Sequence, residues 1–244
     1  MPTAPAGEPA PPPLPLPLLI ACALGIEQLA LRPARTGPGG HPGPVTLVRT
    51  GMGPDRAGRA VRGALATGPL RHAAVLASGF CAGLAPGMLP GDVVVADTVH
   101  DPAGAAPAGT SAGAPAGAPA GAFAEPGHCT GAALLAAAVA RAVPGHRVHT
   151  GTLTGSDRIV GRRERERLRT TGAIAVDMES AAALRAALAA GPRPVAAVRV
   201  VVDAPGHELI RPATVRGGIS AFRVLRAVLP AFHEWHRSLP LPRR

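Results

Sequence analysis

The sequence of 244 residues contains no lysine and no tyrosine, and aromatic residues make up only 2% of it. All 25 basic residues are therefore arginines, and with 15 acidic residues they give a formal net charge of +10. Such a charge by itself favours contact with nucleic acid. However, the arginines are scattered along the chain, and aromatic side chains on which bases could stack are scarce. We therefore predict no nucleic-acid partner and keep a basic nucleic-acid binder as an alternative.

Cysteine and long apolar runs are also scarce. Cys22, Cys81 and Cys129 are odd in number and far apart, which excludes a disulfide framework and a CxxC zinc site. His207 and Glu208 are too few to form a metal site, so we predict none. No apolar run reaches the roughly 20 residues of a membrane-spanning helix. The N-terminal apolar stretch also lacks the basic start of a signal peptide, so we expect a cytoplasmic protein without a transmembrane segment.

Two stretches are rich in proline, alanine and glycine. Residues 1–13 (MPTAPAGEPAPPP) predict a disordered tail. Residues 101–127 include GTSAGAPAGAPAGAFAEPG, which cannot bury enough apolar surface to offset its ordering entropy. Because strand-like and helix-like segments continue on both sides, we predict a long loop inserted into one domain that spans residues 14–240.

The remaining chain alternates between strand-like and helix-like segments. The predicted strands are 16–23, 45–50, 72–78, 92–99, 147–154, 173–176 and 195–202. The predicted helices are 54–67, 131–143, 178–190 and 212–237, together with 162–169, whose alternating charges (RRERERLR) indicate a solvated surface helix. This order predicts a single α/β domain with a central mixed β-sheet flanked by helices.

Acidic residues and glycines collect directly after these predicted strands. Glu27, Glu179 and Asp203 each follow a strand, in a chain with only 15 acidic residues. Glycine-rich turns follow two other strands, at 50–54 (TGMGP) and 78–84 (SGFCAGL). Ligands of such sheets bind at the carboxyl ends of the strands, and glycine lets the backbone approach them closely. We therefore predict a ligand site at this edge.

Each of these residues also has a purely structural interpretation. Glu27 fits a solvated loop, and Asp203 fits the start of a turn. Glu179 fits the first turn of a helix whose N-cap is Asp177. Cys81 fits a small buried apolar residue better than a nucleophile, because no partnered base is near it in the sequence.

Taken together, the segments resemble a known enzyme family. Residues 173–182 (AIAVDMESAA) resemble the signature of the purine nucleoside phosphorylase and nucleosidase superfamily, which includes the methylthioadenosine/S-adenosylhomocysteine nucleosidases. Glu27, the PGDVVV segment at 90–95 and the strand at 198–203 follow in that family's order. The resemblance covers nearly the whole chain from residue 16, apart from the insert. It implies a nucleoside phosphorylase-like fold.

The resemblance also implies cleavage of an N-glycosidic bond, which places positive charge on the sugar and negative charge on the departing base. Asp203 matches the acid that donates a proton to purine N7, which requires it to be protonated near neutral pH. Glu27 matches the acid that positions the attacking water. Glu179 matches the carboxylate that binds the ribose hydroxyls, and Met178 would pack against the ribose.

Further substrate contacts are implied at the turns and after the strand at 147–154. They are Ser78, Gly79 and Phe80 in the glycine-rich turn; Gly51, Gly53 and Arg49 as candidate phosphate ligands; and Ser156, Arg158 and Ile159 as the wall of the base pocket. The phosphorylase branch carries Arg and Ser where this chain has Ala77 and Phe80. Water and inorganic phosphate therefore both stay open as acceptors. The resemblance implies no metal or organic cofactor.

The identity of the 5′ substituent is a finer question. The turn at 50–54 and the VDMES form at 176–180 are most similar to the hopanoid-associated phosphorylases, which release adenine from adenosylhopane. A methylthioadenosine/S-adenosylhomocysteine nucleosidase or a futalosine hydrolase is the alternative within the class. A non-catalytic nucleoside-binding protein is the alternative outside it. The resemblance further implies a homo-oligomer with a small-molecule nucleoside as partner, at the membrane periphery if that nucleoside is lipid-linked.

Overall fold

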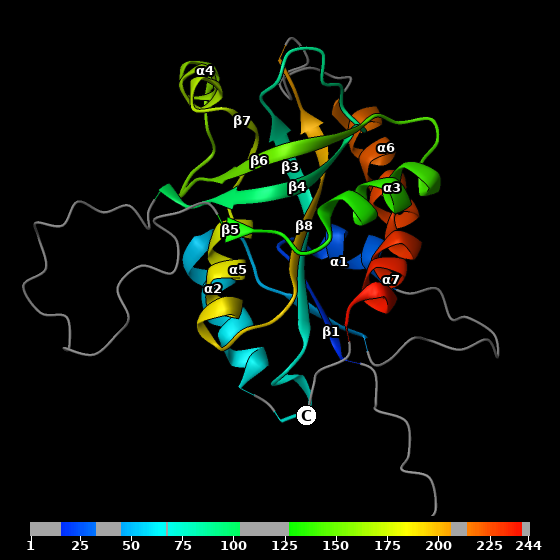
Figure 1. Cartoon of the computed structure of the whole chain (residues 1–244). Coiled ribbons are helices and arrows are strands. Elements are labelled where there is room, and N and C mark those ends of the chain that lie inside the picture. The colour runs from blue at the N-terminus through cyan, green and yellow to red at the C-terminus, as the bar shows by residue number, and fades with distance from the viewer. Residues whose placement is uncertain (1–15, 33–44, 67, 103–126, 206–213, 241–244) are drawn as a thin grey trace, which may run out of the picture.

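Eight strands form one mixed β-sheet in the part of the chain that the computed structural model describes, residues 16–32, 45–66, 68–102, 127–205 and 214–240 (Figure 1). The predicted tail at 1–13, nearly all of the predicted insert, and His207 and Glu208 lie outside these residues. The strands are β1 (Leu18–Cys22), β2 (Val45–Arg49), β3 (Ala74–Gly83), β4 (Val93–His100), β5 (Gly127–His128), β6 (Val148–Gly155), β7 (Ala173–Asp177) and β8 (Val195–Asp203).

The pairing of the longer strands closes on itself. β3 pairs with β8, β8 with β4, β4 with β6, β6 with β7, and β7 returns to β3. The β3–β8, β4–β6 and β6–β7 pairs are parallel, whereas β4–β8 and β3–β7 are antiparallel. β1 and β2 extend the sheet in parallel from β3. The carboxyl ends of β1, β3 and β8 therefore lie at one edge.

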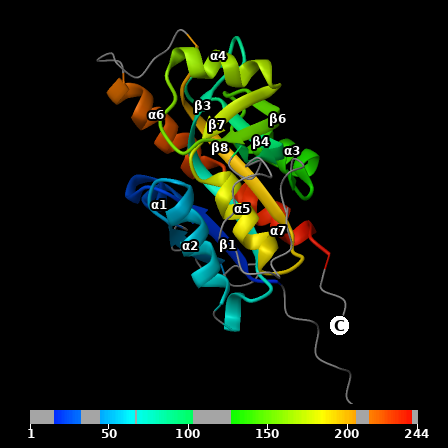
Figure 2. The ribbon, with the colours of Figure 1, turned by 90° about the vertical axis from the view of Figure 1, so that its left-hand side faces the viewer.

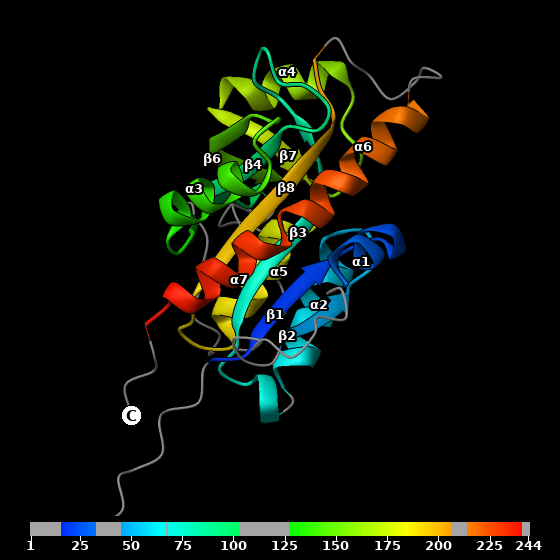
Figure 3. The same ribbon diagram turned by 90° about the vertical axis from the view of Figure 1, so that its right-hand side faces the viewer.

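Helices cover both faces of the sheet (Figures 2 and 3). On one face lie α1 (Gly25–Leu31), α3 (Ala132–Ala142), α6 (Thr214–Ala227) and α7 (Leu229–Ser238); on the other lie α2 (Pro54–Leu65) and α5 (Ser180–Ala189). Alternate residues of β1 point to opposite faces of the sheet. Leu18 and Ile20 pack into the core under the first set of helices, and Leu19 packs into the core under α2 and α5. Burial on both faces explains the nearly continuous apolar runs of the strands. The predicted α/β domain with a central mixed sheet is confirmed.

Helix α4 (Arg162–Thr170) lies apart from both layers (Figure 1). None of its residues is buried, which agrees with the predicted surface helix. It is anchored by Leu168, which packs against a small cluster that includes Leu84, Val160 and Val176. The helix is therefore held to β7 by few apolar contacts. No helix in the described ranges is long and apolar enough to cross a bilayer.

The predicted glycine-rich turn at 78–84 was wrong, because β3 continues to Gly83. Ser78, Gly79 and Phe80 lie inside the strand and pair in register with β8. Gly79 has a φ of +145°, and the register shifts after Cys81. The hydrogen bonds to β8 thus override the local turn preference, and the glycine bends the strand instead of ending it.

Two predicted helix boundaries also differ. Residues Gly25–Leu31 form α1, so Glu27 lies in the first turn of a short helix and not in a loop. The single helix predicted at 212–237 is two helices, α6 and α7, which meet at Val228. Pro230 stands in the first turn of α7, where the missing backbone N–H is tolerated, whereas inside one continuous helix it would break the hydrogen bonding.

Candidate active site

Three acidic residues line one cavity of about 240 Å³: Glu27 follows β1, Glu179 follows β7, and Asp203 is the last residue of β8. Glu27, Glu179 and Asp203 are all buried, with exposed fractions of 2%, 8% and 6%. Phe80 and Met178 line the same cavity. The structure therefore brings together residues that are up to 176 positions apart, from Glu27 to Asp203. β1 and β8 both run parallel to β3, whereas β7 runs antiparallel to β3 and brings Glu179 to the cavity from the opposite direction.

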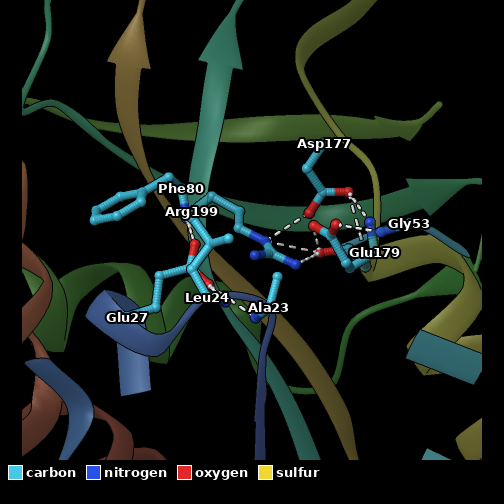
Figure 4. A network of polar contacts seen from close by, with 9 residues as sticks. Ala23, Leu24, Glu27, Gly53, Phe80, Asp177, Glu179 and Arg199 are labelled. Atoms are coloured by element: carbon cyan, nitrogen blue, oxygen red, sulfur yellow. Dashed lines mark hydrogen bonds and ion pairs between the residues drawn. The ribbon is translucent and has the colours of Figure 1, made fainter. Parts of the chain in front are cut away.

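A buried arginine joins the polar network that includes the cavity residues Glu27, Asp177 and Glu179 (Figure 4). Arg199 comes from the middle of β8 and is 1% exposed. Its Nε is 2.6 Å from Asp177 Oδ2, and its Nε and Nη2 donate to Ser180 Oγ at 3.0 and 2.9 Å. Asp177 Oδ1 accepts the backbone N–H groups of Glu179 and Ser180, so this aspartate also holds the start of α5. The prediction that Asp177 caps a helix is close to what is seen, although Glu179 is the N-cap residue.

The charges of the buried groups are interdependent. Burial alone would lower the pKa of Arg199, but Asp177, Glu179 and Glu27 outweigh burial and raise this pKa above its ordinary value. The guanidinium therefore stays charged in the protein interior. Burial also raises the pKa of Glu179, and the positive charge of Arg199 opposes that shift.

Glu27 is held by backbone N–H groups (Figure 4). Its Oε2 accepts the N–H groups of Ala23 and Leu24 at 2.8 Å, and its Oε1 accepts that of Phe80 at 2.7 Å. A Cβ on Gly79 would overlap Glu27 Oε1 and lie 2.6 Å from Arg199 Nη1. Only glycine lets the carboxylate and the guanidinium approach each other across β3. Arg199 Nη1 is buried and has no hydrogen-bond partner among the residues that the structure describes. An unsatisfied buried donor beside a carboxylate favours a bound water or anion.

The turn after β2 donates a backbone hydrogen bond to Glu179, and its predicted phosphate ligands do not gather in one place. The Gly53 N–H donates to Glu179 Oε1 at 2.9 Å, from a backbone with φ of +95° (Figure 4). Arg49 and Gly51 instead line an adjoining hollow of about 420 Å³ together with Arg56. The predicted phosphate ligands therefore lie in two places. Gly53 orients Glu179, the predicted ribose ligand, whereas Arg49 and Gly51 lie beside the cavity that the acidic residues line.

The predicted base wall is also divided. Arg158 and Ile159 line the cavity of the acids, and the Ile159 side chain is 84% exposed. Ser156 lines a neighbouring cavity of about 290 Å³, which shares Arg158 and Met178 with the first. Its Oγ donates to the Arg158 carbonyl oxygen at 2.7 Å and so shapes the segment. Ser78 does not line the cavity; its buried Oγ has no partner within the described ranges.

Asp203 has an unexpected partner in α4. Its Oδ2 is 2.5 Å from Arg165 Nη2, and Arg165 Nε donates to the Val160 carbonyl oxygen at 3.1 Å. Asp203 Oδ1 is buried without a hydrogen-bond partner in the described part of the chain. The carboxyl group is thus held through one oxygen, and the other oxygen is buried and unpaired among the described residues.

Sequence reasoning missed the roles of Arg199 and Arg165. Arg199 carries a signal, because a single arginine stands in the otherwise apolar run VAAVRVVVD and must be paired where it is buried. Arg165 carries none, because every arginine in RRERERLR looks alike in the sequence. Cys81 is buried within β3, and burial raises the pKa of its thiol, in agreement with the predicted core role. The described residues contain no group of three His, Cys, Asp or Glu side chains placed to hold a metal ion.

The chain belongs to the phosphorylase superfamily, whose sequence profile matches residues 35–230. This membership confirms the predicted class, an enzyme of the nucleoside phosphorylase or nucleosidase type. A comparison with curated protein sequences finds no match.

Solved structures of nucleosidases share the fold. The S-adenosylhomocysteine nucleosidase of Streptococcus pyogenes, in complex with 5-methylthiotubericidin, is 21% identical with a TM-score of 0.65, over 93% of this chain and 98% of its own. The 5′-methylthioadenosine/S-adenosylhomocysteine nucleosidase of Neisseria meningitidis, in complex with methylthio-immucillin-A, is 20% identical with a TM-score of 0.64, over 91% and 99%. The Helicobacter pylori enzyme is 16% identical with a TM-score of 0.65, over 92% and 99%. These likenesses establish a common fold over more than nine-tenths of each chain.

Proposed function

We propose that the protein cleaves the N-glycosidic bond of a 5′-substituted adenosine and releases adenine. The observation that carries the proposal is the meeting of Glu27, Glu179 and Asp203 in one cavity next to the buried Arg199. Such cleavage needs a proton donor for the base, ligands for the sugar hydroxyls and a held nucleophile. The cavity offers a separate group for each task.

Asp203 is the proposed proton donor. It lies buried at the end of β8 and lines the cavity, and its Oδ1 has no partner among the described residues. Transfer of its proton to purine N7 lets adenine leave as a neutral molecule when the C1′–N9 bond breaks. General acid catalysis of this kind contributes about 10²–10⁴ in rate.

Glu179 and Glu27 are proposed to act on the sugar and the nucleophile. The Gly53 N–H orients Glu179 Oε1, and the raised pKa that burial gives this side chain suits hydrogen bonding to ribose hydroxyls. Met178 lines the cavity beside Glu179, where it can pack against the ribose. Glu27, held by backbone N–H groups next to the unsatisfied Nη1 of Arg199, is placed to bind a water molecule and to accept its proton.

Water is the acceptor that these contacts favour. Gly53, one predicted phosphate ligand, is engaged with Glu179, and Ala77 and Phe80 supply no cation. Phosphate stays as the second candidate because Arg49 and Arg56 line an adjoining hollow that also includes Gly51. Under that alternative, inorganic phosphate is a co-substrate and the product is a ribose 1-phosphate derivative.

Adenosylhopane is the proposed substrate, supported by the apolar entrance to the cavity. Met52 and Ile159 line it and are 57% and 84% exposed, and Ile26 and Leu29 on α1 are half exposed. Apolar side chains at an entrance suit a lipid-bearing 5′ group. Methylthioadenosine, S-adenosylhomocysteine and futalosine are the competing substrates. A lipid-linked substrate also implies that the protein works in the cytoplasm at the membrane periphery, and we propose a homo-oligomer.

The test is adenine release from adenosylhopane, methylthioadenosine, S-adenosylhomocysteine and futalosine, each with and without phosphate. We expect release from adenosylhopane in the absence of phosphate, and a loss of about 10²–10⁴ in rate for Asp203→Asn. Release that requires phosphate would replace hydrolysis by phosphorolysis. Faster turnover of a short 5′-thio nucleoside would overturn the lipid-bearing substrate.

A control separates catalysis from binding. Fluorescence or calorimetric titration with the same nucleosides measures binding to wild type and to Asp203→Asn. Asparagine has nearly the same shape as aspartate, so this variant keeps the shape of the cavity. Binding without adenine release from any nucleoside would overturn the enzymatic proposal and favour a nucleoside-binding protein.

A further inference from the structure

Among the arginines of α4 (RRERERLRT), Arg165 is the one that lines the cavity of Glu27, Glu179 and Asp203. Its side chain is 17% exposed, whereas that of Arg167, two residues later, is 73% exposed and pairs with Glu164 on the same helix. Arg169 likewise pairs within the helix, with Glu166. A helix that is otherwise solvated therefore directs one guanidinium inward.

The Arg165 guanidinium bridges two sides of the cavity. Nη2 contacts Asp203 Oδ2 at the end of β8, and Nε donates to the carbonyl oxygen of Val160, at the end of the segment that carries Arg158 and Ile159. Arg158 and Ile159 of that segment are exposed and Val160 is buried, and the Ser156 N–H donates to the Asp177 carbonyl oxygen at 2.8 Å. The Arg165 guanidinium therefore links Asp203 to a segment that is also tied to β7.

The contact also decides which oxygen of Asp203 can carry a proton. A guanidinium donates hydrogen bonds and accepts none, so the oxygen that it contacts must be an acceptor. In the protonated carboxyl group, Oδ2 is therefore the carbonyl oxygen, and the proton resides on Oδ1. Oδ1 is the oxygen that has no partner in the described structure.

We propose that Arg165, anchored on the Val160 carbonyl oxygen, is a positioning residue that directs the acid proton of Asp203 to Oδ1. This inference rests on the proposed function. As the C1′–N9 bond breaks, its electron pair stays with the purine and the Oδ1 proton passes to N7. Arg165 touches neither the base nor the sugar in this step; it acts through the orientation of Asp203.

The experiment measures kcat and KM for adenine release by Arg165→Met, Arg165→Lys and Arg169→Met, each alone and combined with Asp203→Asn. Misorientation of an acid by about 1 Å costs about 10²-fold, so we expect Arg165→Met to lower kcat by about that factor. Lysine donates to Oδ2 but cannot also reach the Val160 carbonyl in the same fork, so Arg165→Lys recovers part of the loss. Arg169→Met is the matched control and keeps wild-type kinetics, because Arg169 pairs with Glu166 on the same helix and lines neither cavity.

Two readouts exclude a merely structural role. In the Asp203→Asn background, Arg165→Met should change kcat by no more than about twofold, because the group through which it acts is gone. A 4-nitrophenyl riboside with the same 5′ substituent releases a stable phenolate, which needs no proton from Asp203. The Arg165→Met variant should therefore cleave this substrate at the wild-type rate. Thermal unfolding midpoints equal to wild type would show that the variants fold.

Losses that multiply in the double variant, or an equal loss on the nitrophenyl riboside, would overturn the positioning role of Arg165 while the proposed function stands. If wild type releases adenine from no nucleoside, the proposed function itself fails. The two failures are therefore distinguishable.

Discussion

The two sides of the cavity are built in opposite ways. The floor consists of Glu27, Asp177, Glu179 and Arg199, which are buried and held by backbone N–H groups or by each other. The opposite wall consists of the segment 156–160 and α4, where most side chains are exposed. The floor has the rigidity that bond cleavage requires, whereas the exposed wall can vary with the substrate at little cost to the fold.

Ion pairs on the two sides differ in the same way. Asp177 and Arg199 have side chains that are each 1% exposed, whereas those of Arg167 and Glu164 on α4 are 73% and 27% exposed. Removing one partner from a buried pair leaves an uncompensated charge in the interior, whereas an exposed pair is replaced by water. The comparison predicts that stability depends on the floor.

The largest effect is expected for Arg199→Met. It leaves Asp177 without its guanidinium partner and Glu179 and Glu27 without a nearby positive charge. We expect a loss of about 3–5 kcal/mol in the free energy of unfolding, measured by urea denaturation. Arg167→Met on the opposite wall should cost less than about 1 kcal/mol. Equal losses for the two variants would contradict the contrast between floor and wall.

A smaller effect is expected for Gly79→Ala. The added Cβ would overlap Glu27 Oε1, and the φ of +145° is unfavourable for alanine. We expect a loss of about 1–3 kcal/mol in stability, together with lower adenine release because Glu27 is displaced. Gly63→Ala is the matched control, because nothing lies within 4 Å of its Cβ position on α2. That change should stabilise the protein by up to about 1 kcal/mol. An active, fully stable Gly79→Ala variant would show that the close approach of Glu27 and Arg199 is dispensable.

The smallest effect concerns the pH dependence of stability. Burial raises the pKa of Glu179 above its ordinary 4.5, so the folded state loses stability as the pH rises through the raised value. Glu179→Gln should therefore gain stability relative to wild type between about pH 4 and about pH 7, measured by urea denaturation at each pH.

The opposite sign is expected on α4. The hydrogen bond from Arg169 lowers the pKa of Glu166. The ionised Glu166 therefore stabilises the folded state above the ordinary pKa, and this stability is lost as the pH falls through the lowered pKa. Glu166→Gln should therefore lose stability relative to wild type as the pH rises to about pH 5, at and below the ordinary pKa of the carboxyl group and not above it. The same sign for both variants would show that burial does not govern the titration of Glu179.

Much of the site could be predicted from the sequence because its acidic residues directly follow strands. Glu27 and Asp203 belong to the ends of strands that run parallel to β3, and parallel strands bring their carboxyl ends to one edge. Glu179 follows β7, which runs antiparallel to β3, so the rule of parallel strand ends does not predict its place in the cavity. The turn glycines were less predictable, since Gly53 supports Glu179 and Gly79 bends a strand. A glycine allows several backbone conformations, and only its neighbours in space select one.

The sequence by itself determined the alternation of strands and helices, the apolar strands buried on both faces, the charged surface helix and the acids at the strand ends. These follow from residue composition and spacing along the chain. Only the tertiary structure decided that β3 continues through Ser78–Phe80, that Arg199 joins the buried carboxylates, and that Arg165 alone among the arginines of its segment reaches Asp203. Each of these depends on a hydrogen-bonding or charged partner that is distant in the sequence, and local patterns carry no information about such partners.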